Sequence, residues 1–150
     1  KGLPLRGVFL QNAAFDLLMS IDAKREIEAF AKAVKNTFGV EPGFITMNHV
    51  RAVDMLCNEI QLEQPWLCSN FNMSGFRMNP SPEAVIDSFA SRRTRNIAMS
   101  IFSSGAARAE DSLKYVLGQH PEGGVDAILF GSSSPHNISK NSAAILNHMA

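Results

Sequence analysis

The sequence predicts an α/β protein made of five consecutive strand–helix units with parallel strands. Short apolar runs of strand length alternate along the chain with longer segments whose apolar residues recur at helical spacing. Strands and helices that alternate in this way form a parallel sheet covered by helices. The chain has 150 residues, which suits one domain with a sizeable core, so we treat residues 1–150 as a single α/β domain.

Composition and charge restrict the classes of function. The chain is 45% hydrophobic and 19% charged with a formal net charge of +0, so no overall field attracts nucleic acid or an anionic membrane. Cys57 and Cys68 lack the spacing of a metal site or a disulfide framework, and we expect no metal. No apolar run is long enough to span a membrane and the N-terminus lacks a signal-peptide layout, which favours a cytoplasmic location.

The first two units are predicted between residues 8 and 60. A strand over residues 8–10 ends at Gln11 and Asn12, and the following helix starts near Ser20 and Asp22 and ends at Gly39. The second strand covers residues 43–47. Its helix has one apolar face, made of Val50, Val53, Leu56, Cys57 and Ile60.

The other three units follow the same pattern. The third strand, residues 66–71, precedes a helix that begins at Ser81 and Pro82, and the fourth strand, residues 96–102, precedes a helix with Leu113 facing inward. The fifth strand, residues 127–130, is an unbroken apolar run, which predicts burial on both faces. The last helix begins after a serine cap at Ser134 and has a predicted buried face of Ile138, Ile145, Leu146 and Met149.

Polar residues follow the carboxyl end of each predicted strand, which is where α/β proteins place their ligand sites. Because parallel strands end at the same edge of a sheet, five such segments predict a site there. The residues are Gln11 and Asn12, Asn48 and His49, Asn70 and Asn72, Ser103 to Gly105, and Ser132 to Ser134.

Residues 125–141, VDAILFGSSSPHNISKN, combine features that suit an anion. The strand ends at Gly131, three serines follow, and Pro135 begins a helix. Backbone N–H groups, hydroxyls and the positive end of a helix dipole then surround one point, which favours phosphate. The alternative is that the serines only cap the helix and solvate a turn.

Two architectures fit five parallel strands. A five-stranded doubly wound, flavodoxin-like sheet suits the length and has the strand order 2-1-3-4-5. A complete (β/α)8 barrel, the TIM barrel, typically needs about 250 residues, so this chain would be the C-terminal part of one, with strands in sequential order.

From Gly43 onward the sequence resembles the C-terminal half of the aldo/keto reductases, which are (β/α)8 barrels. The segment GFITMNHVRAVDMLCNEIQLEQPWLCSNFN is similar to a family stretch of strand, helix and strand, and IAMSIFSSG to the seventh strand and its small-residue loop. VDAILFGSSSPHNISKN resembles the eighth strand and the segment that holds the adenosine end of the nicotinamide cofactor. The resemblance favours the barrel and implies NADP or NAD as cofactor.

The resemblance also implies roles for single residues. Asn48 matches a residue that holds the nicotinamide carboxamide, Cys68 a position where a carboxamide-binding Gln is frequent, and Met99 one where Tyr stacks on the ring. The implied contacts of the pyrophosphate and adenosine are Ser103, Ser104, Gly105, Gly131, Ser132, Ser133, Ser134, Asn137 and Asn141.

Three departures from the family pattern affect the choice between NADP and NAD. Gly131 stands for a common Lys, Asn137 for a common Arg, and Lys140 for a common Glu. These changes weaken the family's positive clamp on a 2′-phosphate, so the preference for NADP over NAD stays open.

The catalytic half of the family pattern is not matched. Family members reduce carbonyls with Tyr, Lys, Asp and His from the first half of the barrel, whereas the one tyrosine here, Tyr115, falls on a helix after the fourth strand. His49 follows a strand and could act as a general base, although a lone histidine at a helix start is more often a surface or capping residue. We assign no catalytic residue.

Three functions remain. The first is the cofactor-binding portion of an aldo/keto reductase-like oxidoreductase that binds a dinucleotide. The second is a phosphate-binding barrel enzyme of lyase or aldolase type acting on a phosphorylated small molecule, and the third is a non-catalytic barrel fragment. Because the first and fifth strands would be unpaired edges of a partial barrel, we expect a homo-oligomer or completion by a missing N-terminal half.

Overall fold

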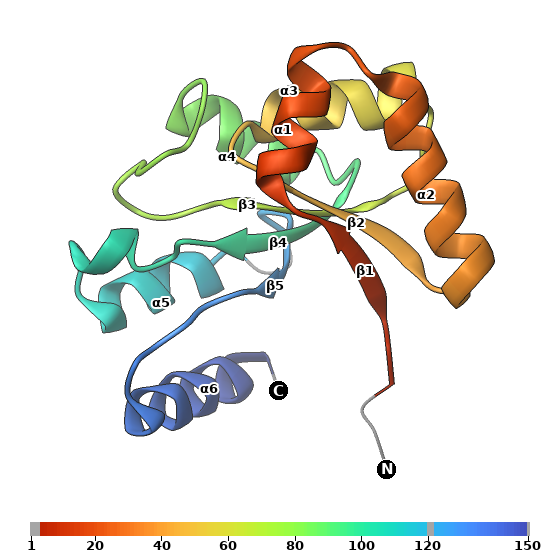
Figure 1. Ribbon diagram of the computed structural model, residues 1–150. Helices are drawn as coiled ribbons and strands as arrows, with labels where there is room; N and C mark the ends of the chain where they lie inside the picture. The colour runs from red at the N-terminus through yellow and green to blue at the C-terminus, as the bar shows by residue number, and fades with distance from the viewer. Residues whose placement is uncertain (1–3, 120–121, 150) are drawn as a thin grey trace.

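The computed structural model describes residues 4–119 and 122–149 and contains one sheet of five parallel strands (Figure 1). The strands lie in the order β1-β2-β3-β4-β5, and every neighbouring pair is parallel. This sequential order confirms the five successive βα units, and it differs from the 2-1-3-4-5 order of a flavodoxin-like sheet. The sheet is open, with β1 and β5 as its edges.

The strands are β1 (Gly7–Leu10), β2 (Glu41–Thr46), β3 (Trp66–Asn70), β4 (Arg95–Met99) and β5 (Val125–Ile128). The helices are α1 (Asn12–Ser20), α2 (Lys24–Phe38), α3 (His49–Val53), α4 (Pro82–Ala90), α5 (Ala109–Leu117) and α6 (Pro135–Met149). A π-helix, η1 (Asp54–Glu59), continues α3, and a 3-10 turn, η2 (Ser103–Gly105), follows β4. No helix in the described ranges is both long and apolar enough to cross a membrane.

Helix α1 was not predicted. The side chain of Gln11 accepts a hydrogen bond from the backbone N–H of Ala13 and caps α1, so this amide stabilises a helix start instead of facing a cleft. Ser20, expected near the start of a helix, ends α1. Helix α2 begins at Lys24 without a side-chain cap and ends at Gly39 in the left-handed conformation, as predicted.

Helices cover one face of the sheet, and two apolar clusters fill the space between them and the strands. In the first, Phe44 of β2 packs between Phe15 of α1 and Phe30 of α2, with ring centroids 4.8 and 5.7 Å away. In the second, Phe71 contacts Phe89 of α4 and Tyr115 of α5. Since Phe71 touches both helices, α4 and α5 lie on the same side of the sheet.

The opposite face of the sheet carries apolar side chains that belong to neither cluster. The register places Phe9, Gly43, Trp66 and Ile97 there, and the ring of Phe9 lies so close over Gly43 that an added Cβ would be 2.4 Å from it. In Figure 1 the helices follow one another around the sheet, from α2 through α1, α3, α4 and α5 to α6. No helix of the described residues covers the second face in this arrangement.

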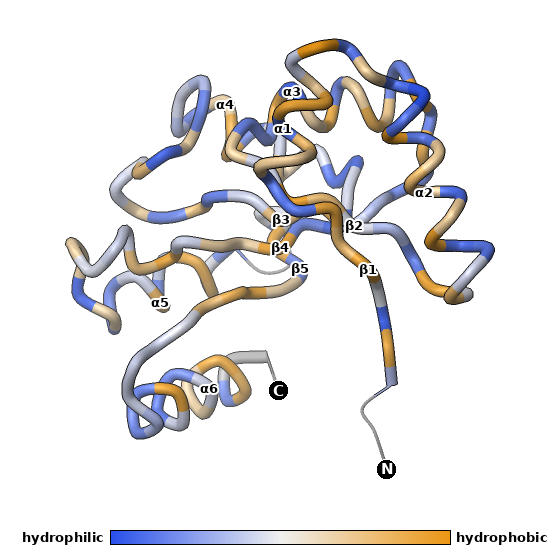
Figure 2. The backbone as a smooth tube through the Cα atoms, viewed as in Figure 1, coloured by the Kyte–Doolittle hydropathy of each residue, from blue (hydrophilic) through white to orange (hydrophobic). Residues whose placement is uncertain are grey.

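The β5–α6 unit differs from its prediction. Burial of the fifth strand on both faces is wrong: Val125 is buried, but the next residues are half-buried and Leu129 is 51% exposed. The cause is that β5 is the edge strand of an open sheet. Figure 2 shows this apolar segment continuing from β5 toward α6.

The predicted buried face of α6 is also mostly wrong. Ile138 and Leu146 are exposed, and only Ile145 packs against the second cluster. The side chain of Met149 lies outside the described part of the chain. Helix α6 packs mainly on α5. Few of its apolar side chains are therefore covered by another element.

Candidate ligand-binding site at the ends of β4 and β5

The loops after β4 and β5 enclose a cavity of about 610 Å³. Its wall is mainly apolar, with Phe102 from the first loop and Leu129 and Phe130 from the second. The complete lining is Met99, Ser100, Ile101, Phe102, Ser104, Gly105, Leu129, Phe130 and Gly131. The parallel pairing of β4 and β5 brings these two loops together, as predicted for the carboxyl edge of the sheet.

A second cavity, of about 270 Å³, adjoins the first and shares Phe102, Gly105 and Gly131 with it. Its other lining residues are small or polar: Ala107, Ala109, Ser132, Asn137, Lys140 and Asn141. Lys140 is the only charged side chain among the described residues that line either cavity. The two cavities are therefore adjacent, the first mainly apolar and the second polar with one positive charge.

The first loop is shaped by residues in the left-handed conformation. Ser100, Ser103 and Ser104 have φ values of 56, 50 and 57°, so the predicted fourth strand ends at Met99 instead of residue 102. The Ser103 hydroxyl is buried and hydrogen-bonds the Ser74 hydroxyl. Ser104 and Gly105 are left to face the cavity.

The second loop uses its serines as predicted for a helix start. The Ser134 hydroxyl accepts from the backbone N–H of Asn137 at 3.4 Å, and the Ser132 hydroxyl accepts from the N–H of Ser134 at 3.2 Å. Capping of α6 by Ser134 is confirmed. Both hydroxyls act as acceptors here, so the O–H of Ser132 remains able to donate to a ligand in the polar cavity.

The electrostatics of the polar cavity favour an anion. No acidic residue lies in the first turn of α6, so the positive end of its dipole is not neutralised from within the helix. Lys140, one turn further along, is exposed and has no ion-pair partner among the described residues. From the sequence, Lys140 was noted only as a departure from a family pattern, and it was not predicted to line the site. Its position three residues after Asn137 indicates that both side chains lie near the N-terminal end of the same helix.

Seven of the predicted cofactor-binding residues line the two cavities: Met99, Ser104, Gly105, Gly131, Ser132, Asn137 and Asn141. Ser103, Ser133 and Ser134 lie in the same two loops without lining either cavity. The remaining two residues are elsewhere. Asn48 lines a separate cavity beside β1 and β2, and Cys68 is buried in the middle of β3, where burial raises the pKa of its thiol to about 12.

The polar residues at the end of β3 hold their own loop in place. Asn70 donates to the carbonyl oxygen of Arg77 at 3.1 Å, and Asn72 donates to the carbonyl oxygen of Phe76 and accepts from its N–H, at 2.9 and 2.8 Å. The β3–α4 loop therefore folds over the middle of the sheet edge. The cavities flank it, on the β4–β5 side and on the β1–β2 side.

His49 and Tyr115 belong to the helix-covered core. His49 is buried, its Nε2 lies 3.0 Å from Oδ1 of Asn96 and its Nδ1 2.9 Å from the hydroxyl of Ser88, and burial lowers its pKa to about 4. It is neither a surface cap nor an accessible base. Tyr115 stacks on Phe71 and lines neither cavity.

Comparison with known proteins adds no family to this geometry: no family model, no curated protein and no solved structure matches the chain. Within the described residues, no group of three or more His, Cys, Asp or Glu side chains is placed to hold a metal ion.

Proposed function

We propose that the chain binds a nicotinamide dinucleotide across the two adjacent cavities between the β4 and β5 loops, as the cofactor-binding portion of an oxidoreductase similar to the aldo/keto reductases. The observation that carries the proposal is that the apolar cavity adjoins the polar cavity lined by Lys140. A dinucleotide has flat rings to place in the first and phosphates to place in the second.

The polar end supplies the contacts that a phosphate needs. The positive end of the α6 dipole, the O–H of Ser132 and the ammonium of Lys140 are available at this end. Met99, Phe102 and Phe130 provide apolar surface for a ring at the other end. Gly131 and Asn137 replace two cations of the family pattern, and Lys140 supplies one positive charge in their place. We therefore expect binding of both NADP and NAD.

The fold supports placing this chain within a (β/α)8 barrel. Sequential parallel order, helices on a single face and a second face lined by residues such as Phe9 and Ile97 are the features of a barrel segment whose inner face lacks its other strands. The open edges at β1 and β5 favour association with a second copy or with an N-terminal half. A monodisperse monomer with both edge strands protected from hydrogen exchange would contradict this.

We expect no carbonyl reduction by this chain alone, because Tyr115 and His49 are packed in the core, away from the proposed cofactor. Incubation with a simple aldehyde and NADPH or NADH measures this. Turnover that disappears when Asn48 or His49 is replaced would refute the expectation.

A phosphate-binding enzyme of lyase or aldolase type is the second candidate, favoured by the same polar cavity and by Lys140, which has no ion-pair partner among the described residues. A phosphorylated small molecule needs only that cavity, whereas a dinucleotide needs both. Binding of a sugar phosphate together with no binding of either dinucleotide would favour this alternative; no binding of any of these ligands would favour a non-catalytic fragment.

The test is calorimetric titration with NADP, NAD and inorganic phosphate. We expect Lys140→Gln to weaken binding of NADP and NAD about tenfold, and Ser132→Asp to weaken it more through charge repulsion, without loss of thermal stability. Lys114→Gln is the matched control, because Lys114 is an exposed lysine on α5 that lines neither cavity. If both site variants bind these ligands with the affinity of the parent chain, the proposal is wrong and the serines serve only as helix caps.

A further inference from the structure

A separate cavity of about 400 Å³ lies at the other side of the sheet edge, beside the carboxyl ends of β1 and β2. It is enclosed by α1, the end of β2, the start of α3 and the β3–α4 loop. Its polar lining consists of Asp16, Ser20, Asn48, Arg51 and Asn79, and Met19 and Met47 complete it. It shares no lining residue with the cavities at β4 and β5, so it does not depend on the function proposed for them.

The carboxylate of Asp16 is held in one orientation by two hydrogen bonds. Its Oδ1 accepts from the hydroxyl of Thr46 at 2.6 Å and its Oδ2 from the backbone N–H of Met47 at 3.0 Å. Each oxygen keeps a lone pair for a further donor. Asp16 lines the cavity and forms no ion pair with the described residues.

The two amides are each held by one of their polar atoms, which leaves the other atom available. Asn48 accepts from the backbone N–H of Arg51 at 3.2 Å, and its NH₂ group has no partner among the described residues. Asn79 donates to the carbonyl oxygen of Met47 at 3.2 Å, and its carbonyl oxygen has no such partner. The cavity therefore presents one fixed amide donor and one fixed amide acceptor in addition to Asp16.

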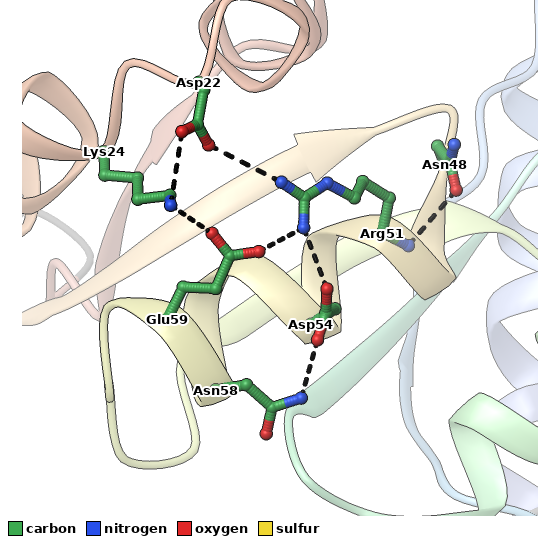
Figure 3. A network of polar contacts seen from close by, with 7 residues as sticks. All are labelled: Asp22, Lys24, Asn48, Arg51, Asp54, Asn58 and Glu59. Atoms are coloured by element: carbon green, nitrogen blue, oxygen red, sulfur yellow. Dashed lines mark hydrogen bonds and ion pairs between the residues drawn. The ribbon is translucent and has the colours of Figure 1, made fainter.

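The guanidinium of Arg51, a lining residue of the cavity, belongs to a network of ion pairs (Figure 3). It contacts Asp54 at 2.8 Å, Glu59, and Asp22 at 3.7 Å, and Lys24 joins the network through Glu59 at 2.7 Å. These cations lower the pKa of Glu59 to about 2, with Lys24 as the larger cause. The positive charge of Arg51 is balanced by Asp54 and Glu59, so the described residues of the cavity offer no unneutralised cation to a phosphate or carboxylate ligand.

We infer that this cavity binds a neutral polyhydroxylated molecule, a sugar or a polyol. Adjacent hydroxyl groups can donate to Asp16 and Asn79 and accept from the NH₂ of Asn48, so one ligand satisfies all three groups. An ammonium ligand has donors only and leaves the Asn48 donor unmatched. The volume of the cavity, about 400 Å³, lies in the usual range of small-molecule sites.

Saturation-transfer NMR with D-glucose, D-xylose and myo-inositol tests the inference, with n-butylamine as the competing cationic probe. Asn79→Ala removes the free acceptor, and Asn48→Ser removes the free donor while retaining an oxygen that can cap α3. We expect transfer to at least one polyol and about tenfold weaker binding in each variant, the effect of one lost hydrogen bond. Asn58→Ala is the control, because Asn58 is an exposed amide that donates to Asp54 outside the cavity.

Thermal unfolding of each variant establishes that it is folded before binding is compared. The absence of transfer to all three polyols in the folded parent chain would overturn the inference. Equal affinity of the parent chain and both folded variants would do the same, as would binding of n-butylamine in place of the polyols.

Discussion

The β2 region and the β5–α6 region both carry apolar side chains, but these side chains pack very differently. Phe44 of β2 is fully buried between α1 and α2, in contact with two other aromatic rings. After β5, Leu129 is 51% exposed, and Leu146 of α6 is 68% exposed. The difference follows from position in the sheet: β2 has a strand on each side, whereas β5 has a neighbour on one side only.

This comparison separates the source of stability from the location of the candidate site. Buried apolar surface is concentrated around β2, β3 and β4, which we expect to account for most of the free energy of unfolding. The loops around Ser104 and Ser132 lie at the loosely packed end, where backbone N–H groups and hydroxyls remain accessible. Regions that bind ligands are often those of low local stability.

The largest effect expected from this difference is that of core truncation. Phe44→Ala removes a fully buried ring and leaves a cavity, so we expect a loss of about 3–5 kcal/mol of unfolding free energy. Leu146→Ala on α6 should change it by less than about 0.5 kcal/mol. Urea unfolding measures both, and a comparable loss in the two variants would mean that α6 packs more tightly than its exposure indicates.

Acid should destabilise the protein through the buried His49. Its pKa in the folded protein is about 4 and its ordinary value is 6.5, so as the pH falls the unfolded chain takes up the proton first. Stability is therefore present above pH 6.5 and is lost progressively as the pH falls toward 4, by a total of about 3 kcal/mol. Urea unfolding at a series of pH values from 7 to 4 measures this loss.

Replacement of single histidines identifies the group responsible for the acid effect. His49→Gln should flatten the pH dependence between 6.5 and 4, even though it lowers stability at pH 7 by disturbing the contacts with Ser88 and Asn96. His136→Gln is the control, because His136 is exposed on α6. An unchanged slope in His49→Gln would attribute the acid sensitivity to carboxylates instead.

The smallest effects should come from the two serine caps. Ser81 accepts from the N–H of Ala84 at 3.2 Å and begins a helix that packs into the core, so Ser81→Ala should cost about 1 kcal/mol. Ser134 accepts at 3.4 Å and begins the exposed α6, so Ser134→Ala should cost about 0.5 kcal/mol. Thermal unfolding measures both losses of stability, with Ser91→Ala as the control because Ser91 is an exposed serine at the end of α4. A larger loss of stability in Ser134→Ala than in Ser81→Ala would contradict the expected order.

The sequence by itself determined the order of the elements and the edge of the sheet where ligands are expected. Apolar runs, the glycine at Gly39 and the Ser-Pro starts at Ser81 and Ser134 are local signals, because a strand period, a left-handed cap and a helix cap depend on a few adjacent residues. The meeting of the β4 and β5 loops followed from parallel pairing of consecutive units.

Tertiary structure decided which of these residues are buried and which polar groups are free. The burial of His49, the exposure of Leu146 and the proximity of Lys140 to the polar cavity depend on neighbours that lie far away in the sequence or on the open edge of the sheet. Helix α1 was missed because a Gln cap is a weak local signal, and its packing on β2 stabilises it. Burial and hydrogen-bond saturation are properties of the assembled sheet and helices, so periodicity and spacing along the chain could not determine them.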